Sequence, residues 1–113
     1  MKLEREDRNG LTVITLATDK LVLANADEFK SQMVDIIRQG GHRLVLDCSG
    51  VETIDSRGLG VLISVMKSLG PDGAMALCGL TDHVRKVFGL TKLDQVFSVY
   101  EDRESAMEAL SRA

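Results

Sequence analysis

The sequence has very few of the residues that usually bind metals, with two cysteines and two histidines in 113 residues. It also has no tryptophan and only one proline. Cys48 and Cys78 lie too far apart to match a zinc-binding pattern, and two histidines add few further ligands. We therefore expect no metal and no cofactor. Each cysteine stands at the end of an expected strand, where cysteine commonly acts as a small buried hydrophobic residue.

The sequence also lacks a long apolar run and an excess of positive charge. No apolar run reaches the roughly 18 residues that a membrane span needs. The N-terminal segment 2–7 is too polar to open a secretory signal. A formal net charge of -3 argues against nucleic acid or an anionic membrane surface as the main partner. We expect a cytoplasmic protein that binds another protein, with no nucleic acid partner and no direct membrane binding.

The residues that are present predict one compact α/β domain over residues 1–113. The composition, 44% hydrophobic and 27% charged, is sufficient for a single core. The dipeptide Asn9-Gly10 is typical of a two-residue hairpin turn, so it predicts an antiparallel hairpin. Apolar patterns predict the hairpin strands at 3–8 and 11–17, later strands at 43–48, 74–78 and 96–100, and helices at 25–39, 56–69, 82–90 and 102–110.

The order ββαβαβαβα predicts how these elements are arranged. Strands separated by helices favour right-handed crossovers and parallel pairing, so we expect a mixed, mostly parallel sheet that opens with the antiparallel hairpin. The helices should lie mainly on one face, which leaves the other face thinly covered. Helix 56–69 is apolar almost all round. Its expected stripe is Leu59, Leu62, Ile63, Met66 and Leu69, with Val61 and Val65 outside it.

The candidate functional site is the segment 53–62, in which an apolar strand leads into a helix that begins at Ser56. The first turn of a helix has unpaired N–H groups and about half a positive elementary charge, so it would stabilise an anion on Ser56. Alternatively, Asp55 or Ser56 acts as the helix N-cap, an ordinary structural role that contributes about 1 kcal/mol.

Two glycines in the same helix favour a functional site over a simple cap. Gly58 and Gly60 each cost a helix about 1 kcal/mol relative to alanine. Such a cost is typical of a close backbone approach, or of a bare surface on which another molecule docks. We therefore expect this segment to do more than start a helix.

The segment Ile54-Asp55-Ser56-Arg57-Gly58-Leu59-Gly60-Val61-Leu62 resembles the signature of STAS domains, the bacterial anti-sigma factor antagonists. That signature runs apolar-Asp-Ser-Ser/x-Gly-Leu-Gly-x-Leu. The segments 45–51, 76–80 and 84–93 follow in the order of the same family, so the resemblance covers nearly the whole chain. It implies a single STAS-like domain.

The resemblance also implies a regulatory cycle. The unphosphorylated domain binds an anti-sigma factor that is also a serine kinase, and this frees a sigma factor. The kinase then phosphorylates Ser56 and ends the complex, and a phosphatase acting on phospho-Ser56 would restore binding. A phosphate would add about -1.5 to -2 charge at the interface, while the helix amides keep the fold intact. The implied partner-binding residues are Asp55, Ser56, Arg57, Gly58, Leu59 and Gly60, with the two glycines and Leu59 forming the flat part of the docking surface.

The sequence departs from the family pattern at two positions. Val22 stands where family members often have an aspartate near the phosphorylation site, so that carboxylate is missing, and Asn25 or Asp27 could substitute for it. Arg57 replaces the second motif serine. Its side chain would either pair with the phosphate or with an acidic patch of the partner, or be a solvated residue of the first helical turn.

Other functions explain the residues less well. Ser56 also resembles the nucleophile elbow of a serine hydrolase, with His42 or His83 as base, but the elbow needs a glycine where Ile54 stands. The glycines lack the pattern of a nucleotide-binding loop. We expect no catalytic residue and no enzyme. The stronger alternative is a similar domain that does not switch, either as a scaffold in a stress-signalling assembly or as an accessory subunit of a lipid transporter.

Overall fold

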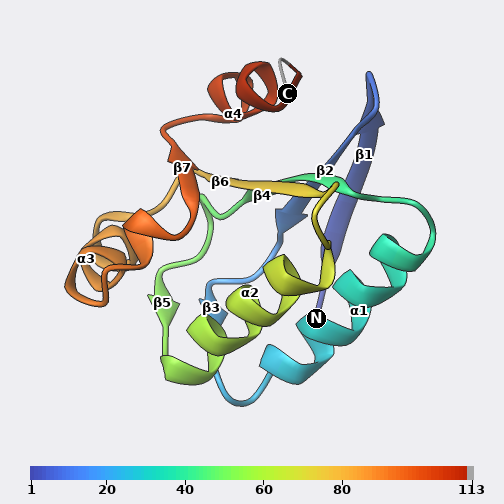
Figure 1. Cartoon of the computed structure of the whole chain (residues 1–113). Coiled ribbons are helices and arrows are strands. Elements are labelled where there is room, and N and C mark those ends of the chain that lie inside the picture. The colour runs from blue at the N-terminus through green and yellow to red at the C-terminus, as the bar shows by residue number, and fades with distance from the viewer. Residues whose placement is uncertain (112–113) are drawn as a thin grey trace.

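The computed structural model describes residues 1–111, and its centre is a five-stranded sheet in the order β1-β2-β4-β6-β7 (Figure 1). The strands β1 and β2 pair antiparallel around the Asn9-Gly10 turn, where both residues have positive φ. Every later neighbour in this sheet pairs in parallel. The predicted hairpin and mostly parallel sheet are confirmed. The strands are β1 (Leu3–Arg8), β2 (Leu11–Leu16), β4 (Arg43–Asp47), β6 (Ala74–Cys78) and β7 (Ser98–Tyr100).

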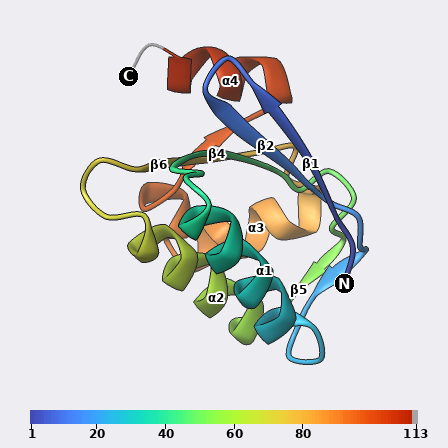
Figure 2. The same ribbon diagram turned by 90° about the vertical axis from the view of Figure 1, so that its right-hand side faces the viewer.

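The helices divide unequally between the two faces of the sheet (Figure 2). The larger apolar core joins one face to the first three helices, and the smaller core joins the other face to the last helix alone. The expectation of helices mainly on one face is therefore confirmed. The helices are α1 (Ala26–Arg38), α2 (Ser56–Ser68), α3 (Asp82–Leu90) and α4 (Arg103–Ser111).

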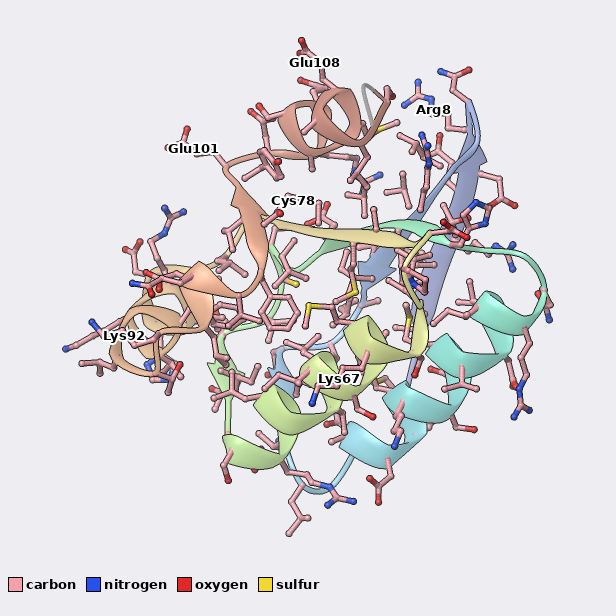
Figure 3. All side chains as sticks on the ribbon, viewed as in Figure 1. Arg8, Lys67, Cys78, Lys92, Glu101 and Glu108 are labelled. Carbon is pink, nitrogen blue, oxygen red and sulfur yellow. The ribbon has the colours of Figure 1, made fainter. Side chains whose placement is uncertain are left out.

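The burial of the central strand β4 on both faces explains its uninterrupted apolar run, Leu44–Leu46. Leu44 and Leu46 belong to the larger core, while Val45 between them belongs to the smaller one, and all three are fully buried. Both faces of the strand are covered, so neither face can carry polar residues. The cysteines follow the same alternation: Cys48 lies in the larger core, and Cys78 lies in the smaller one, on the α4 side of the sheet in Figure 3.

Two short elements were not predicted, namely the strand β3 (Lys20–Leu21) and a 3-10 helix, Leu93–Gln95, that precedes β7. The strand expected before Ser56 is present as β5 (Thr53–Ile54), and it pairs in parallel with β3, outside the main sheet. Elements of two or three residues are too short to show a periodic pattern. The 3-10 helix also corrects the predicted start of the last strand, which begins at Ser98 rather than at residue 96.

The apolar stripe predicted for α2 is partly wrong. Val61 and Val65, expected outside the stripe, are buried in the larger core, whereas Ile63 and Met66 are only half-buried. The helix packs against α1 as well as against the core under the sheet, so its buried surface is wider than one stripe and centred differently. In residues 1–111, no helix combines the length and apolar character required to cross a membrane.

Candidate functional site

Asp55 builds the start of α2. The β3–β5 pair sets Ile54 opposite Leu21, and the chain then leaves the strand in an extended conformation at Asp55. One carboxylate oxygen, Oδ1, accepts a hydrogen bond from the N–H of Gly58 at 2.9 Å, so Asp55 is the N-cap. The other, Oδ2, accepts from the N–H of Leu23 at 2.9 Å. These two bonds hold the pKa of Asp55 below its ordinary 3.8. The carboxylate is therefore ionised at neutral pH.

Ser56 is the first residue of α2 and is exposed. Because Asp55 supplies the cap, the Ser56 hydroxyl is not needed for that role. The hydroxyl lies at the end of the helix where N–H groups are unpaired, as the sequence predicted. It also lines a hollow of about 450 Å³ between α1 and α2. The other lining residues are Asp27, Lys30, Arg57, Gly60, Val61 and Ser64.

Arg57 forms an ion pair with α1. Its Nη2 donates to Oδ1 of Asp27 at 2.6 Å, and the two side chains are 51% and 71% exposed. Pairs this exposed contribute at most about 1 kcal/mol, so the guanidinium can exchange partners at little cost. The structure thus shows a third state that sequence reasoning did not consider, in which Arg57 already holds a carboxylate beside Ser56.

The two glycines have different environments. A Cβ atom on Gly58 would lie 2.2 Å from the backbone oxygen of Leu21, whereas a Cβ on Gly60 would have nothing within 4 Å. Gly58 therefore permits a close approach between α2 and β3, and Gly60 leaves a bare surface. The sequence offered both explanations for the cost of glycine, and the structure assigns one to each position.

The burial of two motif residues corrects their expected place on a flat docking surface. Gly58 is buried, and Leu59 is 9% exposed and packs in the larger core. Neither offers a side chain to a partner, because both are needed to seat α2 on the domain. The surface that remains consists of Ser56, Arg57 and Gly60, together with the half-buried Asp55.

The loop 22–25 lies against this site and is closed by hydrogen bonds. The side chain of Asn25 accepts from the N–H of Val22 at 2.9 Å and donates to the backbone oxygen of Lys20 at 2.8 Å. Asn25 is thus used to shape the loop, which leaves Asp27 as the candidate to replace the carboxylate that Val22 lacks. Leu23, at the tip, is 71% exposed. Sequence reasoning missed it because its position depends on Asp55, 32 residues later.

The histidines do not assemble a hydrolase site. His42 precedes β4 and its Nδ1 lies 2.9 Å from the oxygen of Gly40, while His83 lies near the start of α3. Neither lines the hollow beside Ser56. In the part of the chain that the structure describes, no three histidine, cysteine or acidic side chains gather as a metal site would require. The arrangement suits a modification or docking site.

Comparisons with known proteins find a matching family model and relatives of similar sequence and fold. The family model described as the STAS domain matches residues 2–106. A Thermotoga maritima protein named "Putative anti-sigma factor antagonist" is 34% identical over 88% of this chain and 90% of its own length. A Bordetella bronchiseptica protein, "Putative anti-sigma factor antagonist BtrV", is 32% identical over 100% of this chain and 97% of its own. A crystal structure of a Thermotoga maritima protein with the same description superposes with a TM-score of 0.86, at 31% identity, over 96% of this chain and 93% of that one.

Proposed function

This chain belongs to the STAS domain family, and from that membership we propose that it is an anti-sigma factor antagonist switched by phosphorylation of Ser56. The unphosphorylated form binds an anti-sigma factor that is also a serine kinase, in the cytoplasm, and thereby frees a sigma factor. The kinase transfers the γ-phosphoryl group of ATP to Oγ of Ser56 with release of ADP and the hydroxyl proton. The phosphate ends the complex, and a phosphatase restores the hydroxyl.

The observation that carries this proposal is the exposed Ser56 at the start of a helix whose cap is supplied by Asp55. The hydroxyl is accessible to a kinase, and the helix amides would stabilise the phosphate where it forms. Gly60, one turn further on, leaves open space through which a partner could approach the helix. The names of the relatives from Thermotoga maritima and Bordetella bronchiseptica support the same role.

The surroundings of Ser56 also support an effect of the phosphate on binding rather than on folding. A phosphate adds about -1.5 to -2 charge beside the carboxylates of Asp55 and Asp27. Lys30 and Arg57 line the same hollow and offset part of that charge within the domain. A partner packed against the small hydroxyl would meet a bulky dianion that holds its own water, so the complex would lose affinity while the domain stays folded.

The transfer step needs a group near the hydroxyl that can accept or orient its proton. Val22 cannot serve, but the Asp27 carboxylate lines the same hollow as Ser56 and is held there by Arg57. We assign to Asp27 the place that an aspartate at position 22 often takes in the family. This role explains how Ser56 can be modified despite the substitution.

The proposal is tested by incubating the chain with purified anti-sigma factor kinase of the same organism and ATP, and by measuring intact mass. One added phosphate is expected on the wild type and none on Ser56→Ala. Ser64→Ala is the matched control, because Ser64 lines the same hollow from the same helix, and it should still gain one phosphate. In binding measurements, Ser56→Ala should retain the partner in the presence of ATP, and Ser56→Asp should bind at least about tenfold more weakly.

One observation favours a second candidate, a STAS domain that acts as a scaffold or a transporter subunit without switching. Val22 removes a carboxylate that the phosphotransfer step commonly uses in this family. Under that function, no phosphate would appear on Ser56, and the Ser56→Ala and Ser56→Asp variants would bind their partner equally well. The mass measurement therefore separates the two candidates directly.

A further inference from the structure

Leu23 is an exposed apolar side chain on a loop that several hydrogen bonds hold in place. It is 71% exposed at the tip of the loop 22–25. The backbone N–H groups of Asn25 and Ala26 both donate to the oxygen of Val22, at 3.0 and 2.8 Å, and the Asn25 side chain closes the turn from within. A single exposed leucine is common on protein surfaces. Leu23 differs from such a leucine because hydrogen bonds fix its loop beside a candidate modification site.

The loop is tied to the phosphorylation site through one side chain. Asp55 accepts from the N–H of Leu23 with Oδ2 and from the N–H of Gly58 with Oδ1, both at 2.9 Å. Ser56 follows Asp55 directly in the chain. The position of Leu23 relative to the Ser56 hydroxyl is therefore set by the two oxygens of a single carboxylate, across 32 residues of sequence.

We propose that Leu23 and Ser56 form one docking surface for the anti-sigma factor, in which Leu23 enters an apolar pocket of the partner and Asp55 positions it. The inference rests on the proposed function and deepens it by naming the residue that supplies the apolar contact. Large apolar side chains that become buried at an interface carry much of its affinity. Because Gly58 and Leu59 are buried within the domain, the motif helix offers no exposed apolar side chain in its first turn. Leu23 supplies the exposed apolar side chain that the first turn of the motif helix lacks.

The same geometry gives the phosphate a second way to weaken binding. On Ser56 the dianion would lie next to the Asp55 carboxylate and would compete for the N–H groups at the start of α2. Both effects disturb the carboxylate that holds Leu23. Phosphorylation would therefore alter the apolar contact as well as add charge to the interface.

The first test compares two equally exposed leucines. Leu90, at the C-terminal end of α3, is 75% exposed. Neither leucine lines the hollow beside Ser56, but Leu23 donates its N–H to Asp55 and Leu90 lies on a different helix. In isothermal titration with the purified anti-sigma factor kinase, Leu23→Ser should weaken binding by about 10-fold or more, and Leu90→Ser by less than about 2-fold. Wild-type affinity for Leu23→Ser, or an equal loss for Leu90→Ser, would overturn the inference.

The second test examines Asp55 as the positioning residue. Asn is a good N-cap but has one carbonyl oxygen, so Asp55→Asn cannot accept from both Gly58 and Leu23. Amide hydrogen exchange should show faster exchange at Leu23 with the Gly58 amide still protected. The affinity of Asp55→Asn should fall about as far as that of Leu23→Ser, and the double variant should lose little more. Fully additive losses would contradict the positioning role.

The two levels of the proposal fail differently. If the wild type neither binds the kinase nor gains a phosphate, the proposed function is wrong and this inference with it. If the wild type binds and is phosphorylated but Leu23→Ser behaves like the wild type, the function stands and only the role of Leu23 is wrong.

Discussion

At the start of α2 an aspartate caps the helix and an arginine follows two residues later, and at the start of α4 the cap Asp102 is followed directly by Arg103. Both caps accept from the amide three residues on, at 2.9 Å for Gly58 and 2.8 Å for Ser105. These hydrogen bonds lower the pKa of both caps. The local chemistry of the two helix starts is nearly the same.

The arginines make different contacts. Arg103 reaches inward, where it donates to Oδ2 of Asp47 at 2.8 Å and to the hydroxyl of Thr15 at 2.6 Å, and so ties α4 to the sheet. Arg57 reaches sideways to Asp27, and both of those side chains are more than half exposed. Asp47 is 14% exposed at its side chain. One helix start uses its charges to hold the fold together, and the other keeps its charges at the surface.

If the start of α2 is the site that we propose, this difference shows how such a helix start is distinguished from a structural one. A cap and a nearby arginine are present in both, so neither is diagnostic. The distinguishing feature is which groups stay accessible. At α4, Arg103 is bound to the partly buried Asp47 and to Thr15. At α2, the Ser56 hydroxyl, the weakly paired Arg57 and the loop tip at Leu23 remain exposed together. Substitutions at both helix starts test the contrast.

The largest effect is expected from Gly58→Ala. The new methyl group would meet the backbone oxygen of Leu21 at 2.2 Å, and a backbone atom cannot move aside without shifting α2 or β3. Overpacking of this kind should lower the free energy of unfolding by about 2–3 kcal/mol. At the equivalent position of α4, Ser105 is exposed, so Ser105→Ala should cost less than about 1 kcal/mol. Urea unfolding of both variants measures the difference, and equal costs would contradict the close approach at Gly58.

The elements that local sequence patterns could predict are those whose causes lie within a few residues. Asn9-Gly10 accepts positive φ at both positions, so the hairpin could be read directly. The expected helix 56–69 agrees with α2 (Ser56–Ser68) because its boundaries are set by a cap and an apolar pattern in the same segment. The position of Ser56 as the first residue of that helix could be predicted for the same reason.

The parts that could not be predicted depend on partners far along the chain. Gly58 is needed because Leu21, 37 positions earlier, passes against it in a strand of two residues. Arg103 meets Asp47 across 56 residues. No periodic pattern reports such pairs. Local sequence patterns therefore could not distinguish Arg103 from Arg57, or separate the buried motif residues from the exposed ones.

Removing Arg103 should have an intermediate effect on the free energy of unfolding, and removing Arg57 a small one. Arg103→Ala leaves the partly buried Asp47 without its cation and should lower the free energy of unfolding by about 1–2 kcal/mol at neutral pH, after allowance for solvent screening. Arg57→Ala removes only an exposed pair and should change it by less than about 0.5 kcal/mol. Urea unfolding at pH 7 compares the two, and equal losses would contradict the contrast between the helix starts.

The pH dependence sharpens this comparison. Burial raises the pKa of Asp47, but hydrogen bonds from Arg103 and Ser49 outweigh it and leave the pKa below the ordinary 3.8. The unfolded state then binds the proton more readily, so the stabilising contribution is present above about pH 4 and is lost as the pH falls through the lowered pKa. The difference between wild type and Arg103→Ala should therefore narrow toward pH 3. A difference that stays constant would mean that Arg103 acts through its alkyl chain.

Gly60→Ala should change stability less than Gly58→Ala or Arg103→Ala, and it is the most informative substitution for function. Open space surrounds the position where the methyl group would lie, and alanine favours a helix over glycine by about 1 kcal/mol, so the free energy of unfolding should rise by up to that amount. If Gly60 is kept bare for a partner, the same methyl group should weaken binding of the anti-sigma factor. Stability and affinity would then change in opposite directions. Gly58→Ala and Arg103→Ala would not show this pattern, because both lower the free energy of unfolding. A variant that gains stability and keeps wild-type affinity would place the docking surface elsewhere on the helix.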